Sequence, residues 1–251
     1  MVICMAVHAY IEKIMLTAMA FEARYDDGLR YIDHCGETIS RIRKYDKSWV
    51  FIGANANTGT MLNKPSELAL SFGIDRLNVA RQEPAMLENG EEKAEVLGRQ
   101  CESLYEIIVQ GIRVPETSRV GIRYRFTAPS DTLEEADRFV NRGVKSPLLE
   151  TVLKSTKSAI RDSAVSYVVE ELESGYRRRI VIETQVTVPA GAPVHTGLEK
   201  TGDAAVSIDI DTFTRPESGN FQKSNLFIQN NYNRSRLIAL DIFNWLRQQQ
   251  R

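Results

Sequence analysis

Alternation between apolar and charged residues is the clearest pattern in this chain. Over residues 119–126 every second residue is apolar, and Arg119, Arg123 and Arg125 alternate with them. Residues 206–213 repeat the pattern with Asp209 and Asp211 in the charged positions. Successive side chains of a strand point to opposite faces of a sheet, so each segment predicts a strand with one dry face and one charged face.

This pattern predicts an α+β protein built on mainly antiparallel sheet, with helices covering the dry face. Turn residues and short apolar runs divide the rest of the chain into further strands. These are predicted at residues 16–25, at 49–52 as a short buried strand, over 67–81 with a break near Gly73, and at 158–172, 177–188 and 204–213.

Helical spacing of apolar residues predicts the covering elements. Helices are expected over residues 29–45 and 91–110, from a cap at Ser130 to about 142, at 148–153, and from 221 or 233 to about 249. The last of these is a long C-terminal helix that is apolar on more than one side, so we expect it to pack across the dry face of the sheet.

A boundary near residue 115 separates two α+β halves, residues 1–115 and 116–251. No linker-like composition marks the boundary, so we expect the halves to pack together, either as two fused units or as one domain.

Composition narrows the class of protein. The formal net charge of -1 argues against attraction of the whole protein to nucleic acid or to an anionic membrane. The three cysteines have no C-x-x-C spacing, so neither a disulfide framework nor a zinc site is expected, and a reducing cytoplasm fits best. Glu12 and Lys13 interrupt the apolar N-terminal residues, so no signal peptide or membrane span is expected.

Asp209 and Asp211 are the strongest candidates for a metal site. Residues at i and i+2 of a strand share a face, and Glu183 on a neighbouring strand offers a third carboxylate. Such a set suits Mg²⁺ or Mn²⁺ in a metal-dependent hydrolase or nuclease. The alternative is that these acids form the solvated side of the strand and pair with the arginines across the sheet.

Arginine residues on the predicted charged face are candidates for binding a partner; they are Arg119, Arg123, Arg125, Arg177 and Arg179. Guanidinium groups match the geometry of both phosphate and carboxylate oxygens. Tyr124 alternates to the opposite side, so no stacking residue for a base accompanies them. A protein partner is therefore favoured, with nucleic acid and a second copy of the chain as alternatives.

Other motifs carry less chemistry. The loop at residues 53–60 has five residues between its glycines and no following Lys-Ser/Thr, so it fails the phosphate-loop pattern and predicts a hairpin. His34 and Cys35 are adjacent on a predicted helix, where a structural role is expected. His195 lies in a Gly/Pro-rich loop, and no G-x-S-x-G motif supports a serine hydrolase.

Three segments carry a resemblance to a known family: residues 20–25, residues 118–124, and residues 208–211 before a helix that contains Phe243. With an R-x-G-x-R-Y core followed by an aliphatic-D-x-D strand, the chain resembles a sporadically distributed family of uncharacterised prokaryotic proteins. The proline-containing N-terminal segment typical of that family is not evident. The resemblance implies no particular activity, and the patchy distribution implies accessory loci such as defence or toxin-antitoxin systems.

Together these patterns predict a non-enzymatic binding or assembly module, because no convergent catalytic set accompanies the scaffold. The first alternative is the metal-dependent hydrolase or nuclease that uses the two aspartates. The second is a small-molecule sensor with its ligand enclosed between the sheet and the C-terminal helix.

Overall fold

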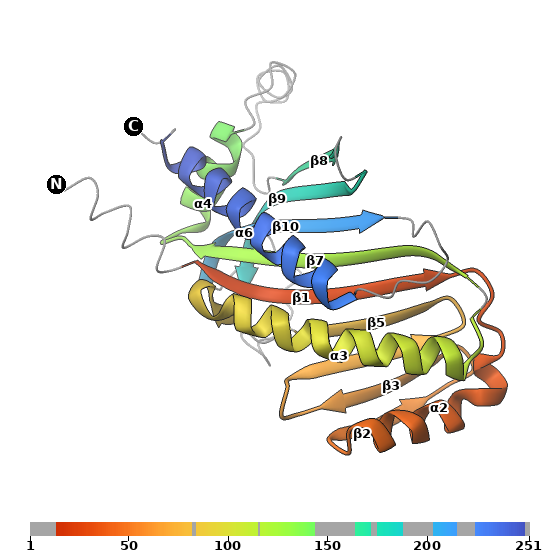
Figure 1. Cartoon of the computed structure of the whole chain (residues 1–251). Coiled ribbons are helices and arrows are strands. Elements are labelled where there is room, and N and C mark those ends of the chain that lie inside the picture. The colour runs from red at the N-terminus through yellow and green to blue at the C-terminus, as the bar shows by residue number, and fades with distance from the viewer. Residues whose placement is uncertain are drawn as a thin grey trace.

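The structure, a computed structural model, describes residues 14–81, 84–114, 116–143, 164–171, 175–187, 203–214 and 224–248. These residues form one ten-stranded antiparallel sheet and four α-helices, including a long C-terminal helix (Figure 1). The predicted α+β class is therefore confirmed. The helix expected at residues 148–153 and the loop that contains His195 lie outside the described residues.

The N-terminal half begins with a strand and a helix, continues with an antiparallel meander and ends with a long helix. Its elements are β1 (Met15–Tyr25), α2 (Tyr31–Tyr45), β2 (Trp49–Ala54), β3 (Thr58–Asn63), β4 (Leu68–Gly73), β5 (Arg76–Arg81), the short β6 (Ala85–Met86), a 3-10 turn (Leu87–Asn89) and α3 (Gly90–Gly111).

The C-terminal half follows the same order with fewer strands. Its elements are β7 (Thr117–Pro129), α4 (Leu133–Gly143), β8 (Ala164–Glu170), β9 (Arg177–Thr187), β10 (Asp203–Thr214) and α6 (Ser224–Gln248). None of the described helices is long and apolar enough to cross a membrane.

The two halves share one sheet through the antiparallel pairing of β1 with β7. The strand order is β2-β3-β4-β5-β1-β7-β10-β9-β8, and β6 pairs with β1. In this central pair, Phe21 of β1 lies opposite Ile122 of β7. The residue-115 boundary falls between α3 and β7, and the sheet continues across it.

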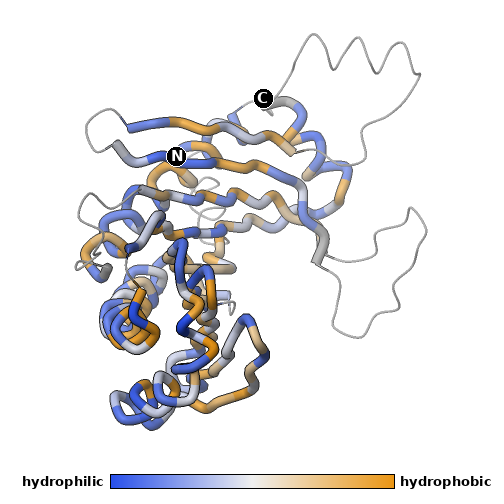
Figure 2. Tube along the Cα trace, turned by 90° about the vertical axis from the view of Figure 1, so that its right-hand side faces the viewer, coloured by the Kyte–Doolittle hydropathy of each residue, from blue (hydrophilic) through white to orange (hydrophobic). Residues whose placement is uncertain are grey.

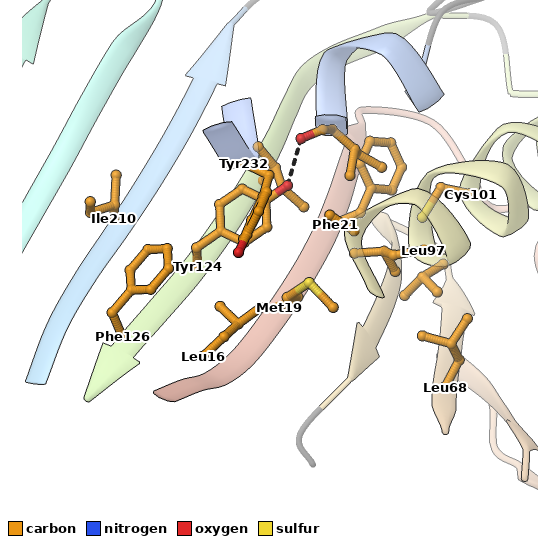
Figure 3. Packing of buried hydrophobic residues seen from close by; sticks show 14 of the residues in the cluster. Leu16, Met19, Phe21, Leu68, Leu97, Cys101, Tyr124, Phe126, Ile210 and Tyr232 are labelled. Atoms are coloured by element: carbon orange, nitrogen blue, oxygen red, sulfur yellow. Dashed lines mark hydrogen bonds between the residues drawn. The ribbon is translucent and has the colours of Figure 1, made fainter. Parts of the chain in front are cut away.

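The dry face of the sheet is the one that the helices cover. Hydrophobic and hydrophilic positions alternate along the strands (Figure 2), and the apolar side chains of β1 and β7 that face the helices are buried. Tyr124 donates a hydrogen bond to the Ile228 carbonyl of α6 at 2.6 Å, and its ring meets that of Tyr232 edge-on at 5.5 Å between centroids (Figure 3). The prediction that the C-terminal helix packs across this face is confirmed.

Close approach of α3 and α6 depends on a glycine. A Cβ atom added to Gly98 would lie 2.3 Å from the Asn225 Oδ1 atom and 3.2 Å from its Cα atom, so even a methyl group would require the Asn225 side chain and the start of α6 to shift. Nearby, the Tyr232 hydroxyl donates to the Leu87 carbonyl at 3.1 Å. The long helix of each half is therefore packed against that of the other.

The prediction of a buried strand at residues 49–52 is wrong in its burial. Only Trp49 is buried, whereas Val50, Phe51 and Ile52 are exposed, because β2 forms an edge of the sheet. The sequence also gave no prediction of β3, whose residues begin in the expected loop. An apolar run alone does not distinguish an edge strand from a central one.

The cap of α4 also differs from the prediction. Thr132 Oγ1, rather than Ser130, accepts a hydrogen bond from the Glu135 backbone N–H at 3.1 Å. Ser130 instead donates to the Glu135 carboxylate at 3.1 Å. The helix consequently begins at Leu133, with Thr132 in the capping position.

Candidate functional site

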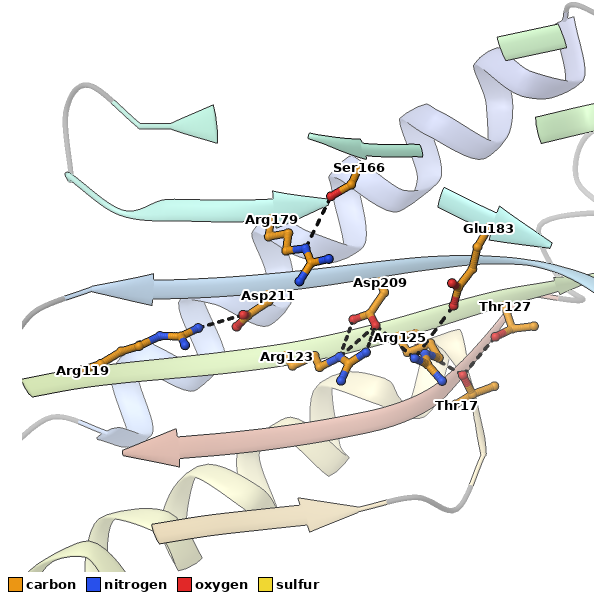
Figure 4. Close-up of polar contacts among 10 residues, drawn as sticks. All are labelled: Thr17, Arg119, Arg123, Arg125, Thr127, Ser166, Arg179, Glu183, Asp209 and Asp211. Carbon is orange, nitrogen blue, oxygen red and sulfur yellow. Dashed lines mark hydrogen bonds and ion pairs between the residues drawn. The ribbon is translucent and has the colours of Figure 1, made fainter. Parts of the chain in front are cut away.

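The charged face is the side of the sheet opposite the helices, formed by alternate residues of four neighbouring strands (Figure 4). We define it by Glu22 of β1, Arg119, Arg123 and Arg125 of β7, Asp209 and Asp211 of β10, and Arg179 and Glu183 of β9. The register of β10 places Asp209 opposite Arg125 and Asp211 opposite Arg123. The pairing of β7 with β10 is therefore what brings the predicted basic and acidic residues together.

Asp209 is the most enclosed carboxylate of this face. Its Oδ1 atom accepts a hydrogen bond from Arg123 Nε at 2.7 Å, and its Oδ2 atom is bonded by both Arg123 and Arg125, the latter at 3.1 Å. Its side chain is 6% exposed, whereas that of Arg123 is 52% exposed. The hydrogen bond to Asp209 raises the pKa of Arg123. Two guanidinium groups thus cover one nearly buried carboxylate.

Asp211 has a weaker set of contacts. It accepts a hydrogen bond from Arg119 at 2.9 Å, and the Arg119 guanidinium lies 4.3 Å from the centroid of the Phe213 ring. Burial raises the pKa of the Asp211 carboxyl, Arg119 lowers it and Glu22 raises it further. Its negative charge is therefore only partly compensated by its neighbours.

Residues of β9 make fewer and longer ionic contacts on this face than residues of β10 do. Arg125 reaches Glu183 at 3.9 Å. Arg179, which is exposed and lies opposite Asp211, makes one weak hydrogen bond to Ser166 at 3.4 Å and has no ion pair within the described ranges. Arg177 is paired with Glu170 of β8 at 3.1 Å, at the margin of the face. Of the arginines that define the charged face, Arg179 has the fewest contacts with other described residues.

Three residues of β1 and β5 extend the ionic contacts, although their role was not predicted from the sequence. Glu22 lies 2.6 Å from Arg24, 3.7 Å from Arg76 and 4.0 Å from Arg119. The alternation of apolar and charged residues over 21–25 was a usable signal for Glu22 and Arg24. Their position beside β7 depends on strand order, which no local pattern encodes.

The three carboxylates proposed as metal ligands are brought to the same face, but arginines occupy them. Asp209 is bonded by two guanidinium groups, Asp211 by one, and Glu183 lies near Arg125. Among the described residues, no cluster of three or more His, Cys, Asp or Glu side chains is arranged to hold a metal ion. A divalent cation would first have to displace guanidinium groups. The alternative of pairing across the sheet matches the observed contacts.

A hollow lies on the opposite side of the sheet, where the predicted small-molecule sensor would hold its ligand. Its volume is about 340 Å³, and α4, β8, β9 and the end of α6 line it. The hollow shares no residue with the charged face.

Comparison of the chain with protein-family models and with curated proteins gave no match.

Proposed function

We propose that the protein is a non-enzymatic binding or assembly module whose charged face binds an acidic surface of a protein partner. The observation that carries this proposal is the layering of charge. Asp209 is 6% exposed beneath Arg123, which is 52% exposed. Although acids and arginines are intermixed, the outermost groups at the centre of the face are therefore guanidiniums.

The arginines are held in place before a partner arrives. Arg123 is fixed by two-point contact with Asp209, and Arg125 is shared between Asp209 and Glu183. Side chains that are already ordered lose less conformational entropy on binding. Guanidinium groups keep further N–H donors for carboxylates after making one ion pair.

Small side chains leave the flank of these arginines open. The β1 residues opposite Arg123 and Arg125 are Ala20 and Ala18. Neither alanine can cover a guanidinium group, so a partner can approach from the side of β1 without displacing a long side chain.

A protein partner fits this face better than nucleic acid. Recognition of single-stranded nucleic acid commonly uses aromatic rings on which bases stack. On this face the Phe213 ring is covered by the Arg119 guanidinium, and Tyr124 is buried on the other side of the sheet. A formal net charge of -1 also provides no general attraction to a polyanion.

The test is a tagged pull-down from a lysate of the source organism, at low and high salt, with the wild-type chain and two matched variants. Arg179→Glu changes an arginine of the charged face that has one weak hydrogen bond. Arg99→Glu makes the same change on α3, where Arg99 is 59% exposed. We expect an acidic protein that the wild type and Arg99→Glu retain at low salt, and that Arg179→Glu retains at least about tenfold less.

Equal retention by Arg179→Glu would place the binding surface elsewhere. Capture of nucleic acid alone would favour the nucleic-acid alternative. The proposal that the module serves a prokaryotic accessory system rests on the sequence resemblance, and a partner encoded beside this gene would support it.

A further inference from the structure

We propose that the hollow beside the C-terminal end of α6 binds an organic ammonium group carried on an apolar body. This inference goes beyond the proposed function, because it concerns the helix-covered side of the sheet. The hollow measures about 340 Å³, at the lower end of the range for small-ligand sites. Its lining residues are Val140 of α4, Tyr167 of β8, Ile182 of β9, and Asp241, Ile242, Trp245 and Leu246 of α6.

The floor of the hollow is dry. Val140 is fully buried, Leu246 is 2% exposed and Ile182 is 8% exposed. These side chains come from a helix, a second helix and a strand that the core holds in place. An apolar group that enters the hollow would therefore meet a preformed surface and gain by leaving water.

Two aromatic side chains line the hollow from opposite layers. Tyr167 of β8 is 51% exposed and Trp245 of α6 is 45% exposed. Leaving two large aromatic rings half exposed at one hollow is unfavourable for an empty surface and typical of a binding site. Their π faces attract cations, with tryptophan the strongest of the aromatic residues.

Asp241 supplies the charge that selects the ligand. It is exposed, it lines the hollow, and in the part of the chain that the structure describes it has no ion pair. The residues three and four positions away along α6 are Leu237, Ile238, Asn244 and Trp245, so no cation of the helix lies one turn from Asp241. Trp245 and Asp241 are four residues apart and therefore lie on the same side of α6.

These features discriminate among ligands. An anion would be repelled by Asp241, and a hydrated metal ion would gain only one carboxylate in an apolar setting. A neutral apolar molecule would fill the hollow but would gain nothing from the carboxylate charge. An ammonium group on an aliphatic body can contact the aromatic rings and the carboxylate through its charge, while its aliphatic part packs on the apolar floor. It can come from a free amine or from a lysine side chain of a partner.

The two tryptophans of the chain provide a direct readout. Trp49 is buried and donates its indole N–H to Gln100 at 3.3 Å, so its signal in ¹H–¹⁵N spectra is an internal reference. We would titrate the full chain with choline and with 3,3-dimethylbutan-1-ol, its neutral isostere. Choline should shift the Trp245 indole signal saturably and leave that of Trp49 in place. The alcohol should bind about tenfold more weakly.

Two variants separate charge from shape. Asp241→Asn should weaken choline binding about fivefold to tenfold and leave binding of the alcohol unchanged. Tyr167→Leu, which keeps an apolar wall but removes the ring, should weaken choline binding about threefold or more. Both residues are exposed, so neither change threatens the fold.

The source of the ammonium group is tested with Nα-acetyl-lysine N-methylamide. Binding of this amide with an affinity similar to that of choline supports the site and points to a partner side chain, whereas choline binding alone supports it and points to a free amine. Absence of any Trp245 shift, equal affinity for choline and the alcohol, or an Asp241→Asn variant that binds choline like the wild type would overturn the proposal.

Discussion

One row of paired residues crosses the solvent-accessible side of the sheet and changes character at its centre. In the N-terminal half the row consists of Leu62, Ala69, Ala80 and Ala20; in the C-terminal half it continues through Arg123, Asp211 and Arg179. The two halves share the order strand, helix, antiparallel meander and long helix. Their helix-facing positions are mostly apolar, with buried polar exceptions in both halves such as Arg81 of β5 and Arg178 of β9. The halves thus share a scaffold and differ in the side chains on the solvent-accessible side of the sheet.

The difference teaches that charge on this sheet is not simply the polar side of amphipathic strands. If solvation alone required it, the outward positions of β3, β4 and β5 would carry it too, but most of those positions hold uncharged side chains. The arginine and carboxylate ladder lies on β1, β7, β10 and β9 and ends at Arg76, the first residue of β5. We infer that the contrast marks one half of the surface for binding.

The largest expected effect is a loss of stability from a substitution on the charged face, compared with a substitution on the uncharged strands. Asp209→Asn removes the carboxylate charge that Arg123 and Arg125 share. In a buried site, a charge left without its partner lowers the free energy of unfolding by several kcal/mol. Here we expect the free energy of unfolding to fall by about 2 kcal/mol, because Arg123 stays hydrated. Ser71→Ala, on β4 in the uncharged half, should change the free energy of unfolding by less than about 0.5 kcal/mol. Urea unfolding measures both, and an Asp209→Asn variant as stable as Ser71→Ala would contradict the contrast.

A second prediction addresses the scaffold that the halves share. Gly98→Leu should destabilise the protein by about 2 kcal/mol, because the added side chain meets Asn225 of α6. The matched control is Gly36→Ala on α2, where a Cβ atom has no neighbour within 4 Å. That change should stabilise the protein by up to about 1 kcal/mol through higher helix propensity. Thermal unfolding measures the stability of both variants. If Gly98→Leu and Gly36→Ala change stability by a similar amount, Gly98 does not lie in close contact with Asn225.

The smallest expected effect is the titration of Asp211. Burial raises its pKa in the folded protein, so the folded state binds this proton more tightly than the unfolded chain. The stability from this group is therefore fully present below the ordinary value of about 3.8 and is lost as pH rises through the folded-state pKa. The wild type should gain stability relative to Asp211→Asn as pH falls through that range.

Two substitutions test the causes of this shift. Arg119→Gln should raise the pKa of Asp211 further, and Glu22→Gln should lower it, because these neighbours act in opposite directions. A ¹³C-detected carboxylate titration measures both. Identical titration curves for the three proteins would mean that the ion pairs across β1, β7 and β10 are not formed in solution.

Much of the fold was predictable because the signals are local. Alternation predicted β7, β9 and β10 and placed Arg119, Arg123, Arg125, Asp209 and Asp211 on the charged side, and a turn signal predicted the end of β1. Helical spacing predicted α3, and the apolar C-terminal helix was correctly placed on the dry face. These predictions need only the two-residue and 3.6-residue periods of strands and helices.

The remainder depends on tertiary contacts. The sequence did not determine that β10 lies beside β7, so metal binding by Asp209 and Asp211 and pairing with arginine were both open. It did not reveal that Val50 to Ile52 form an edge, because burial depends on strand order. The hollow near Trp245 requires α4, α6 and β8 to meet, and no single segment contains that information.

The most direct test of the central claim is an arginine footprint of the partner complex, in which phenylglyoxal modifies accessible guanidinium groups and mass spectrometry measures each site. Binding should protect Arg123 and Arg179 on the charged face, while Arg41 and Arg99 on the exposed surfaces of α2 and α3 react as in the free protein. Unchanged reactivity at Arg123 and Arg179, or protection confined to the helices, would contradict the account that the charged face is the binding surface.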